Sequence, residues 1–341
     1  MEPYRRALGA ILGATLVLAT VAGVIAGRRQ DPQLTAGRPA PSSSASTPSV
    51  APTPGTKAPV PPAEGAWIGA WVKPEVATPE GRLAAVADFE SQLGRPLDVA
   101  HVYHRWEDEF PSSDDRALAA DGKTVLLSWA GTDTRQIQLG LYDDLIRERA
   151  RDLKRWGAPV LLEWRWEMDR PNLQAEIWSP EDYIAAWKHI RAIYQQEQVQ
   201  NVGWVWCPLA AGFGPGRAQP YYPGDDQVDW LCADTYPGPT VQPFAEAVGP
   251  FLEWARGRPH PILIGEFGMR ESLGEVTRQE WLTATGEFVK TQPQIKGLVY
   301  FDSDRTESPT DSYDMSLRNA PGSMAVFSRI AREPYFSASL S

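Results

Sequence analysis

The sequence predicts an α/β protein whose main domain is a single (β/α)8 barrel. Three observations lead to this prediction. Eight short apolar or aromatic runs follow one another, several stretches between them have helical periodicity, and the region from Gly65 to Ser341 has the length of one barrel. Strands that alternate with helices form a parallel sheet, and eight such strands are expected to close it. A membrane segment and a disordered stalk are expected ahead of the barrel, so that the chain divides into residues 1–29, 30–64 and 65–341.

The first segment is apolar and long enough to cross a bilayer. Ala7 to Gly27 carries no charge and has two arginines on each side. We expect an uncleaved signal anchor; a cleaved signal peptide and a buried core helix are the alternatives. Because both flanks are basic, their charge does not decide the orientation in the membrane.

A stretch rich in Pro, Ala, Ser and Thr follows, from Ala36 to Glu64. Such a composition cannot bury enough apolar surface to fold, and its prolines hold the chain semi-extended. We interpret it as a stalk, although a linker without a positional role has the same composition. A membrane segment followed by a stalk predicts a domain held at the cell surface, outside the cell, or secreted if the first segment is cleaved.

The composition of the chain limits its partners and cofactors. A net charge of −10 argues against nucleic acid as a partner. The four histidines show no metal-ligand spacing, so we expect no catalytic metal and no cofactor. The two cysteines, Cys207 and Cys232, fall on neighbouring predicted strands, where either a disulfide or two separate buried thiols would fit.

The predicted strands each end in polar or aromatic residues. They are Trp67–Val72, Val99–Trp106, Thr124–Gly131, Val160–Asp169, Val202–Pro208, Val228–Pro237, Ile262–Gly268 and Lys296–Asp304. Among the helices, Leu141–Trp156 is followed by Gly157 as a C-cap, and Ser179 precedes another as its N-cap. The stretch Thr277–Glu280 matches a capping box, which predicts a helix start there.

The fourth predicted strand changes character along its length. It begins as a buried strand and ends with Glu163, Arg165 and Glu167 alternating with Trp164 and Trp166. Barrel enzymes assemble their chemistry at the C-terminal ends of the strands, which makes Glu167 a catalytic candidate. The alternative is that the three charged residues form an ion-pair network inside the barrel.

Glu266 closes the seventh predicted strand in the same way, after four apolar or small residues. Two carboxylates that face each other across a barrel mouth suit glycoside hydrolysis, in which one protonates the departing oxygen while the other attacks the anomeric carbon or activates water. The alternative for Glu266 is a buried acid that caps a loop.

The chain resembles glycoside hydrolase family 26, best known for β-mannanases, over nearly the whole barrel region. The resemblance is carried by the order and strand placement of seven motifs: Trp166–Asp169, Ser179–Trp187, Asn201–Trp206, Tyr222–Trp230, Ala233–Tyr236, Gly265–Gly268 and Pro321–Phe327. It implies a retaining enzyme in which Glu167 is the acid/base and Glu266 is the nucleophile. It also implies that Tyr236 donates a hydrogen bond to that nucleophile.

One departure from the family matters, directly before the acid/base. Where family members usually have His-Glu-Met-Asn, this chain has Trp166-Glu167-Met168-Asp169. The indole replaces a polar contact to the sugar with an apolar wall. The resemblance therefore supports the mechanism more strongly than it supports mannan as the substrate. An apolar wall also favours the protonated form of Glu167.

Several other side chains are candidates for binding sugar. Trp71, Trp106, Trp129, Trp204 and Trp206 fall at or near predicted strand ends, where indoles can pack on pyranose faces; about half of them are expected in the cleft and the others in the core. His104 is the better rim candidate, and His101 is expected inside. Asp302 and Asp304 suit either sugar hydroxyls or loop capping.

These observations predict a surface-displayed retaining β-glycosidase that acts by double displacement. The substrates that the resemblance implies are β-mannan, mixed-linkage β-glucan and β-1,3-xylan, as polysaccharide or oligosaccharide. The alternative is a glycan-binding protein that keeps the barrel without turnover.

Overall fold

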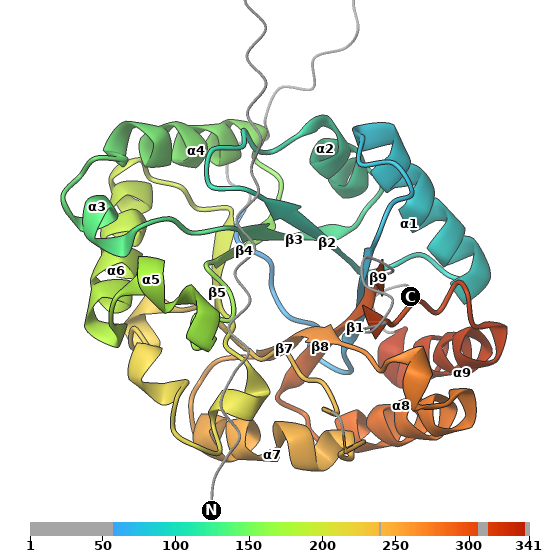
Figure 1. Ribbon diagram of the computed structural model, residues 1–341. Coiled ribbons are helices and arrows are strands. Elements are labelled where there is room, and N and C mark those ends of the chain that lie inside the picture. The colour runs from blue at the N-terminus through green and yellow to red at the C-terminus, as the bar shows by residue number, and fades with distance from the viewer. Residues whose placement is uncertain (1–56, 239, 306–312, 338–341) are drawn as a thin grey trace, which may run out of the picture. The chain divides into compact units, whose positions relative to one another are not determined.

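The computed structural model is a closed barrel of eight parallel strands in sequence order (Figure 1). The structure describes residues 57–238, 240–305 and 313–337. The strands are β1 (Trp67–Val72), β2 (Val99–His104), β3 (Thr124–Trp129), β4 (Val160–Trp164), β5 (Val202–Trp206), β6 (Trp230–Cys232), β7 (Ile262–Phe267) and β8 (Ile295–Asp302). β1 pairs with β8 over its whole length and closes the barrel. The predicted barrel is therefore confirmed, and most observed strands end earlier than predicted.

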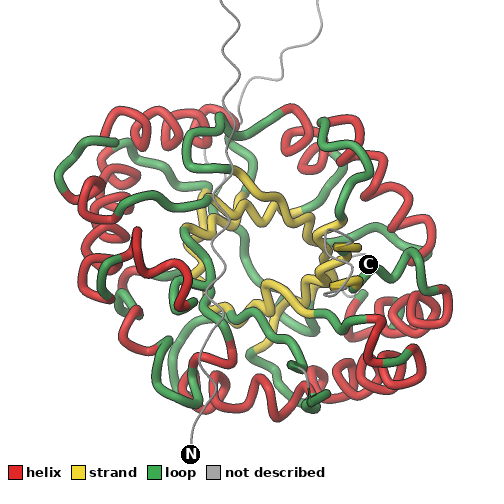
Figure 2. Tube along the Cα trace, viewed as in Figure 1, coloured by secondary structure: helices red, strands yellow, loops and turns green. Residues whose placement is uncertain are grey.

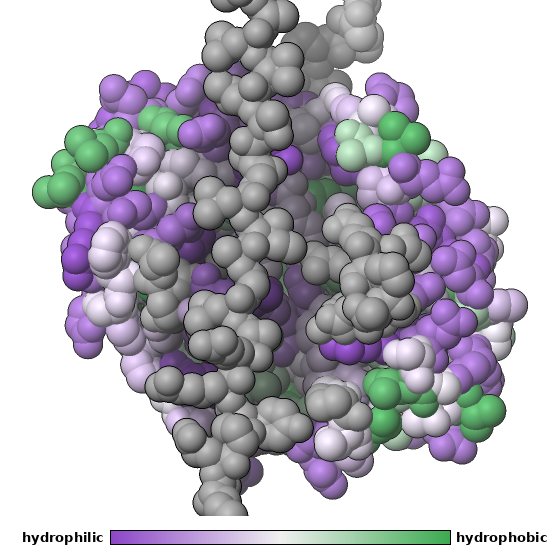
Figure 3. Space-filling model, viewed as in Figure 1, coloured by the Kyte–Doolittle hydropathy of each residue, from purple (hydrophilic) through white to green (hydrophobic). Residues whose placement is uncertain are grey.

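Helices surround the barrel as an outer ring (Figure 2). They are α1 (Pro79–Leu93), α2 (Ser113–Ala120), α3 (Thr134–Gln138), α4 (Asp143–Trp156), α5 (Gln174–Ile177), α6 (Pro180–Gln196), α7 (Phe244–Ala255), α8 (Glu275–Lys290) and α9 (Pro321–Ala331), with a two-stranded ribbon of β9 (Asp304–Arg305) and β10 (Tyr313–Asp314). The exposed surface of the ring is mainly hydrophilic (Figure 3). This pattern leaves the apolar faces of the helices for packing on the strands.

Two of the three predicted helix boundaries are confirmed. Gly157 ends α4 in the left-handed conformation, and Ser179 caps α6 by accepting the backbone N–H of Asp182 at 3.1 Å. The predicted capping box at Thr277 is wrong, because α8 already begins at Glu275. Its N-cap is Gly274, whose φ of 101° turns the chain without a capping side chain.

Alternation along the strands separates two packed regions. An inner set of side chains fills the barrel, and an outer set packs between strands and helices. The inner cluster consists of Trp67, Val99, Leu126, Leu161, Val205, Cys207, Trp230, Cys232, Leu263 and Val299. Inward residues therefore have fixed positions on each strand, and their direct neighbours in sequence point outward.

The regular ladders on both sides of β6 are short. This strand pairs with β5 only through Trp230 and Leu231, and with β7 only through Leu231 and Cys232. By contrast, β1 and β8 share six paired positions, from Trp67 to Val72 on β1. Beyond the strand, isolated bridges continue the pairing on both sides, between Leu209 and Asp234 and between Thr235 and Phe267.

The end of the predicted stalk packs on the N-terminal face of the barrel. Ala58 donates its backbone N–H to Gln200 at 2.9 Å, ahead of β5, and Lys296 at the start of β8 donates to the carbonyl of Ala63 at 3.2 Å. The predicted membrane segment and the rest of the stalk lie outside the described residues. Among the residues that the structure does describe, no helix is long and apolar enough to span a bilayer.

Candidate active site

A cavity of about 760 Å³ opens at the C-terminal ends of the strands and contains both candidate carboxylates. Its walls combine aromatic, cationic and apolar side chains from β1, β2, β7 and β8 and from the loops after β4, β6, β7 and β8. They are Trp71, Lys73, Tyr103, Trp166, Glu167, Arg170, Tyr236, Pro237, Gly238, Glu266, Gly268, Arg270, Leu273, Phe301, Ser303 and Met315. A cavity of this size and lining suits a small polar molecule or a segment of a polymer.

Glu167 reaches the cavity because the chain leaves the regular strand after Trp164. Arg165 and Glu167 both have positive φ, 52° and 51°, which non-glycine residues rarely adopt. The turn sends Arg165 away from the cavity to Glu176, at 2.8 Å, while Glu167 accepts a hydrogen bond from Arg170 at 2.6 Å. The alternative of an ion-pair network inside the barrel is therefore wrong. Strained conformations of this kind are typical of functional sites.

Glu266 reaches the cavity through an irregularity within β7. The pairing of β7 with β8 shifts between Ile264 and Phe267, which interrupts the alternation and turns Glu266 inward. Both of its oxygens are hydrogen-bonded: Tyr103 donates to Oε1 at 2.5 Å and Tyr236 donates to Oε2. Burial raises the pKa of both tyrosine hydroxyls well above the ordinary value, so they remain donors at physiological pH. The tyrosines fix the orientation of the carboxylate and favour its charged form.

The two candidate carboxylates lie close together. One oxygen of Glu167, one of Glu266 and one of Asp234 all lie within 4.8 Å of one another. Burial raises the pKa of Glu167, against the opposing effect of Arg170, and burial together with the charge of Glu167 raises the pKa of Glu266 to about 7. The two therefore titrate as a pair, which keeps one proton up to about neutral pH. A pair that shares one proton holds a general acid and a carboxylate nucleophile at the same time.

Three aromatic residues form one continuous wall of the cavity. Tyr103 lies between two indoles, with its ring centroid 4.9 Å from that of Trp71 and 5.1 Å from that of Trp166. The same tyrosine holds Glu266, so the wall and the carboxylate are mechanically linked. Flat aromatic surface beside paired carboxylates is suited to the face of a sugar ring.

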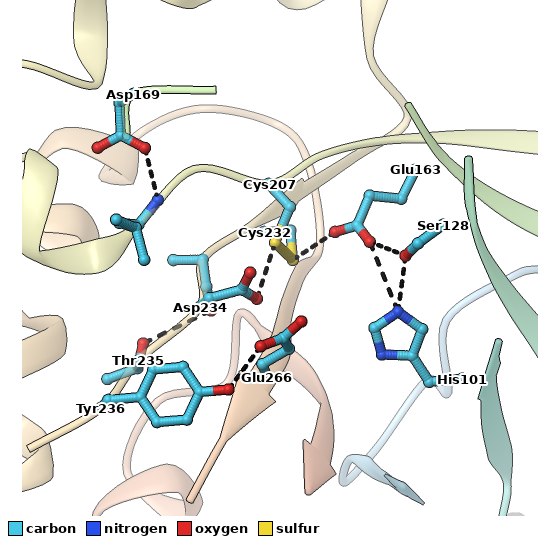
Figure 4. Close-up of a disulfide and its surroundings, with 12 residues drawn as sticks. His101, Ser128, Glu163, Asp169, Cys207, Cys232, Asp234, Thr235, Tyr236 and Glu266 are labelled. Carbon is cyan, nitrogen blue, oxygen red and sulfur yellow. Dashed lines mark hydrogen bonds and ion pairs between the residues drawn. A yellow bond between two sulfur atoms is a disulfide. The ribbon is translucent and has the colours of Figure 1, made fainter. Parts of the chain in front are cut away.

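A layer of polar side chains lies inside the barrel near Glu266 (Figure 4). His101 contacts the hydroxyl of Ser128 at 2.6 Å, and this hydroxyl donates to Glu163. All three side chains are buried, and His101 is inside the barrel, where the sequence places it. This layer satisfies the polar groups of the interior and separates the cavity from the apolar floor.

A disulfide joins Cys207 and Cys232 in the same layer. Of the two alternatives that the sequence left open, the structure therefore has the bridge. Asp234 Oδ1 lies 3.3 Å from Cys207 Sγ, and burial raises the pKa of Asp234 well above its ordinary value. Because a disulfide sulfur carries no hydrogen, only a protonated Asp234 can donate to it.

Four predicted sugar-binding residues lie away from the cavity, for one shared reason. Each is an immediate sequence neighbour of an inward residue and therefore points outward. Trp129 and Trp206 are fully buried: Trp129 stacks on Trp106, and Trp206 packs against Trp254. The predictions for these two residues are corrected, since neither can reach a ligand.

The other two are polar residues with partners outside the barrel. His104 bonds to Asp115 at 2.9 Å, towards α2. Asp302 is buried and accepts from the guanidinium of Arg318 at 2.7 Å, so it caps a loop, which was the alternative for this residue. Asp304 pairs with Lys73 at 3.2 Å at the rim.

The predicted residues that do line the cavity are Glu167, Glu266, Tyr236, Trp166 and Trp71. Sequence reasoning missed Tyr103 and Arg170, which contact the two carboxylates directly. Alternation along β2 places Tyr103 on the same face as His101, so the signal for it was present. No periodic signal identifies Arg170, because it follows a turn.

Within the described part of the chain, two groups of buried side chains are close enough to hold a cation. One is Glu167, Asp234 and Glu266; the other combines Glu163 and Asp234 with the two cysteines. In the second group the sulfurs are joined to each other and offer no thiolate. In the first, both oxygens of Glu266 already accept from tyrosines. The expectation that no metal takes part stays a prediction.

The chain matches no protein-family model, but it is similar to known proteins. It is 25% identical to endoglucanase H of Acetivibrio thermocellus over 284 residues, which are 77% of this chain and 30% of that protein. It is 27% identical to a β-1,3-xylanase of a Vibrio species over 202 residues, which are 50% of this chain and 41% of that enzyme. The chain thus spans less than half the length of the curated relatives that it matches.

Solved structures share the fold. A β-mannanase of glycoside hydrolase family 26 from Bacteroides ovatus superposes with a TM-score of 0.62 at 17% identity, covering 80% of this chain and 90% of that one. A family 26 protein from Muricauda gives a TM-score of 0.61 at 16% identity, covering 80% of this chain and 87% of that one. The resemblance that the sequence motifs indicate is therefore confirmed: this chain is a (β/α)8 barrel similar to the enzymes of glycoside hydrolase family 26.

Proposed function

We propose that the chain is a retaining glycoside hydrolase that cleaves β-linked polysaccharide. One observation carries the proposal: two buried carboxylates, Glu167 and Glu266, have oxygens within 4.8 Å of each other in a cavity with an aromatic wall. Retaining glycosidases separate their carboxyl groups by ~5–5.5 Å, whereas inverting enzymes need ~6.5–9.5 Å to admit a water. The short separation supports the retaining alternative.

The surroundings of each carboxylate support a distinct role. Glu266, oriented by Tyr103 and Tyr236, attacks the anomeric carbon as the leaving oxygen takes a proton from Glu167. Glu167 then removes a proton from the water that releases the glycosyl group from Glu266. Trp166 adjoins Glu167 and presents apolar surface, which favours the protonated form needed in the first step.

The proposed substrate class is the one that the matched proteins share. The matched proteins are described as an endoglucanase, β-1,3-xylanases and β-mannanases, which all act on β-linked backbones. We propose β-mannan, mixed-linkage β-glucan and β-1,3-xylan as the polysaccharides to test. Trp166, where the family usually has histidine, sets this chain apart at the acid/base, and we expect it to influence the choice among them.

The test is incubation of the purified full-length chain with these three glycans. The matched control is Glu266→Gln, which keeps the size of the side chain and removes its charge. We expect the wild type to release oligosaccharides whose newly formed reducing ends are initially the β-anomer by NMR, and the control to release none. Initial α-anomers would overturn retention. Binding without product from any of the three glycans would favour a glycan-binding protein instead.

We also propose that the domain is displayed at the cell surface through a membrane anchor. The uncharged stretch Ala7–Gly27 and the proline-rich stretch after it support this proposal. The disulfide supports export, because such bonds persist in oxidising compartments. Protease added to intact cells should release an active fragment; protection of the domain until the cells are broken would contradict the proposal.

A further inference from the structure

The Cys207–Cys232 disulfide lies inside the barrel next to Asp234, and a carboxylate oxygen of Asp234 lies within 4.8 Å of an oxygen of each candidate carboxylate. Cys207 follows β5 and Cys232 ends β6, so the bridge joins neighbouring strands inside the barrel (Figure 4). Both residues are almost completely buried, at 1% and 0% exposure. The bridge belongs to the inner cluster, and its sulfurs lie next to the carboxylates of Asp234 and Glu163, at 3.3 and 3.9 Å.

The bridge joins two strands whose regular ladder is short. β6 is three residues long and is paired with each neighbour at only two positions. One residue pair in each ladder lies at or next to the bridged cysteines: Trp206 pairs with Leu231, and Cys232 pairs with Leu263. A covalent link at this point restricts how far the ends of β5 and β6 can separate.

The sulfurs also form the surface on which β7 rests. A Cβ atom added to Gly265 would lie 2.6 Å from the sulfur of Cys232 and 2.9 Å from that of Cys207. The backbone of β7 therefore packs against both sulfurs one residue before Glu266. Without the bond, the two sulfurs would have to lie roughly 3.5 Å or more apart, like other non-bonded atoms. Gly265 and Asp234 occupy the adjacent space, so the separating sulfurs would displace them.

The backbone of Cys207 anchors the other carboxylate. Its carbonyl accepts the N–H of Glu167 at 2.7 Å. This anchor matters because Glu167 has a φ of 51° and no longer belongs to the ladder of β4. The same bridge thus contacts, by backbone or by sulfur, the chain segments that carry both carboxylates.

We infer that the Cys207–Cys232 disulfide is a positioning element of the active site, which fixes the placement of Glu167 relative to Glu266. The inference rests on the proposed function and deepens it. The disulfide does not touch the substrate. Its loss changes the distance between the two carboxylates, and therefore the chemical step, while the aromatic wall that binds the sugar stays in place.

The first experiment compares the wild type with Cys207→Ser/Cys232→Ser in the full chain, at temperatures well below both melting temperatures. We expect kcat to fall roughly 10-fold or more, because displacements of about 1 Å can cost about 10²-fold, with KM changed less than about 3-fold. The matched control is Leu161→Ala, in the same inner cluster but away from the carboxylates. It should lower the melting temperature and leave kcat unchanged. Equal kcat in the double variant and the wild type would overturn the inference.

A second measurement reads the geometry without turnover. The carboxyl carbons of Glu167 and Glu266, followed by ¹³C NMR during a pH titration, report how strongly the two acids interact. We expect their titration curves to move in the double variant and to stay unchanged in Leu161→Ala. If the wild type cleaves no glycan, the proposed function fails while this titration still decides whether the disulfide positions the pair. Unchanged curves would overturn the inference.

Two further experiments test whether the disulfide is present and provide an alternative in case Cys207→Ser/Cys232→Ser does not fold. Alkylation of denatured, unreduced wild type should label no thiol, and labelling of both cysteines would overturn the inference. Gly265→Ala keeps the disulfide but forces β7 away from it, so it should reproduce the fall in kcat and the altered titration. Wild-type behaviour in this variant would show that contact between the sulfurs and β7 does not place Glu266, and would also overturn the inference.

Discussion

The ends of β4 and β7 bring a carboxylate to the same cavity by different means. At β4 the chain leaves the ladder, and Glu167 lies on a turn with positive φ, paired with a cation from its own loop. At β7 the carboxylate stays within the strand, where a shift in pairing turns it inward, and it accepts from two tyrosines, one on β2 and one in the loop after β6. The Glu167 carboxylate thus has a partner from its own loop, whereas the partners of the Glu266 carboxylate come from other parts of the barrel.

The difference suits the two roles in double displacement. A nucleophile has to stay charged and aimed at one carbon, which two tyrosine donors from separate elements achieve. An acid/base has to change its protonation state twice in each cycle, and a single partly exposed cation such as Arg170 stabilises its anion without fixing it from several sides. The comparison therefore predicts that damage to the two ends has different consequences.

The largest difference is expected when each carboxylate is removed. Glu266→Ala should lower kcat by ~10⁴-fold or more even with an activated leaving group, because the attacking group is missing. Glu167→Ala should cost ~10²–10⁴-fold on natural glycan and much less in the first step with such a leaving group. With azide present, the first variant should form an α-azide and the second a β-azide from a β-glycoside, measured by NMR. If each variant forms the opposite anomer, Glu167 is the nucleophile and Glu266 is the acid/base.

The tyrosines that hold Glu266 should come next. Tyr103→Phe and Tyr236→Phe each remove a hydrogen bond to a charged group, which contributes ~1.5–3 kcal/mol, so kcat should fall roughly 10- to 100-fold. KM should change little for Tyr236→Phe and the aromatic wall should persist in Tyr103→Phe, since the ring remains. Steady-state kinetics of both variants provide the test, with Tyr222→Phe, outside the cavity, as the control. If both variants have the kcat of the wild type, the two tyrosine hydroxyls do not contribute to catalysis.

Removal of Arg170 should move the pH profile. The wild-type profile of kcat/KM should fall above a pH of about 7, where the carboxylate pair loses its shared proton. Arg170 lowers the pKa of Glu167, so Arg170→Gln should raise that pKa and move the basic limb to higher pH. Arg147→Gln, in an ion pair on the helical ring, is the matched control and should leave the limb unchanged. A limb that moves to lower pH would contradict the assignment of Arg170.

The smallest expected effect is that of the apolar wall at β4. Trp166→His makes the surroundings of Glu167 more polar, so the pKa of Glu167 should fall and the basic limb should move to lower pH, opposite to the shift for Arg170→Gln. The preference among mannan, mixed-linkage glucan and β-1,3-xylan should change as well. The measurement is kcat/KM against pH on each glycan. An unchanged profile and preference would place Trp166 outside the reacting centre.

Much of the fold could be predicted because alternation and capping are local properties. The strands were found in sequence because apolar runs recur at regular intervals, and Ser179 and Gly157 marked helix ends through their own conformations. The capping box at Thr277 failed because Gly274 already supplied a turn that needs no capping side chain. The predicted run Val228–Pro237 is longer than β6 at both ends, because Val228 and Ala233, close to the two ends of the strand, are also apolar.

The sequence predicted which residues of the candidate site lie near strand ends. It did not predict in which direction their side chains point. Closeness to a strand end selected Trp129 and Trp206 together with Trp71, and only the alternation of inward and outward positions distinguishes them. The two carboxylates obey no alternation, because a turn and a bulge redirect them. Arg170 depends on the same turn, so a period-two pattern could not reveal it.

The segment that crosses the N-terminal face of the barrel has a practical consequence for protein production. Ala58 and Ala63 bond to the beginnings of β5 and β8, and Pro59 lies against Gly203. A recombinant fragment that starts at Gly65, where the composition changes, would strip this cover from the floor of the barrel and expose apolar surface at its base. A fragment that starts at Lys57 keeps the cover. The fragment that starts at Lys57 should therefore give a higher expression yield and aggregate less than the fragment that starts at Gly65.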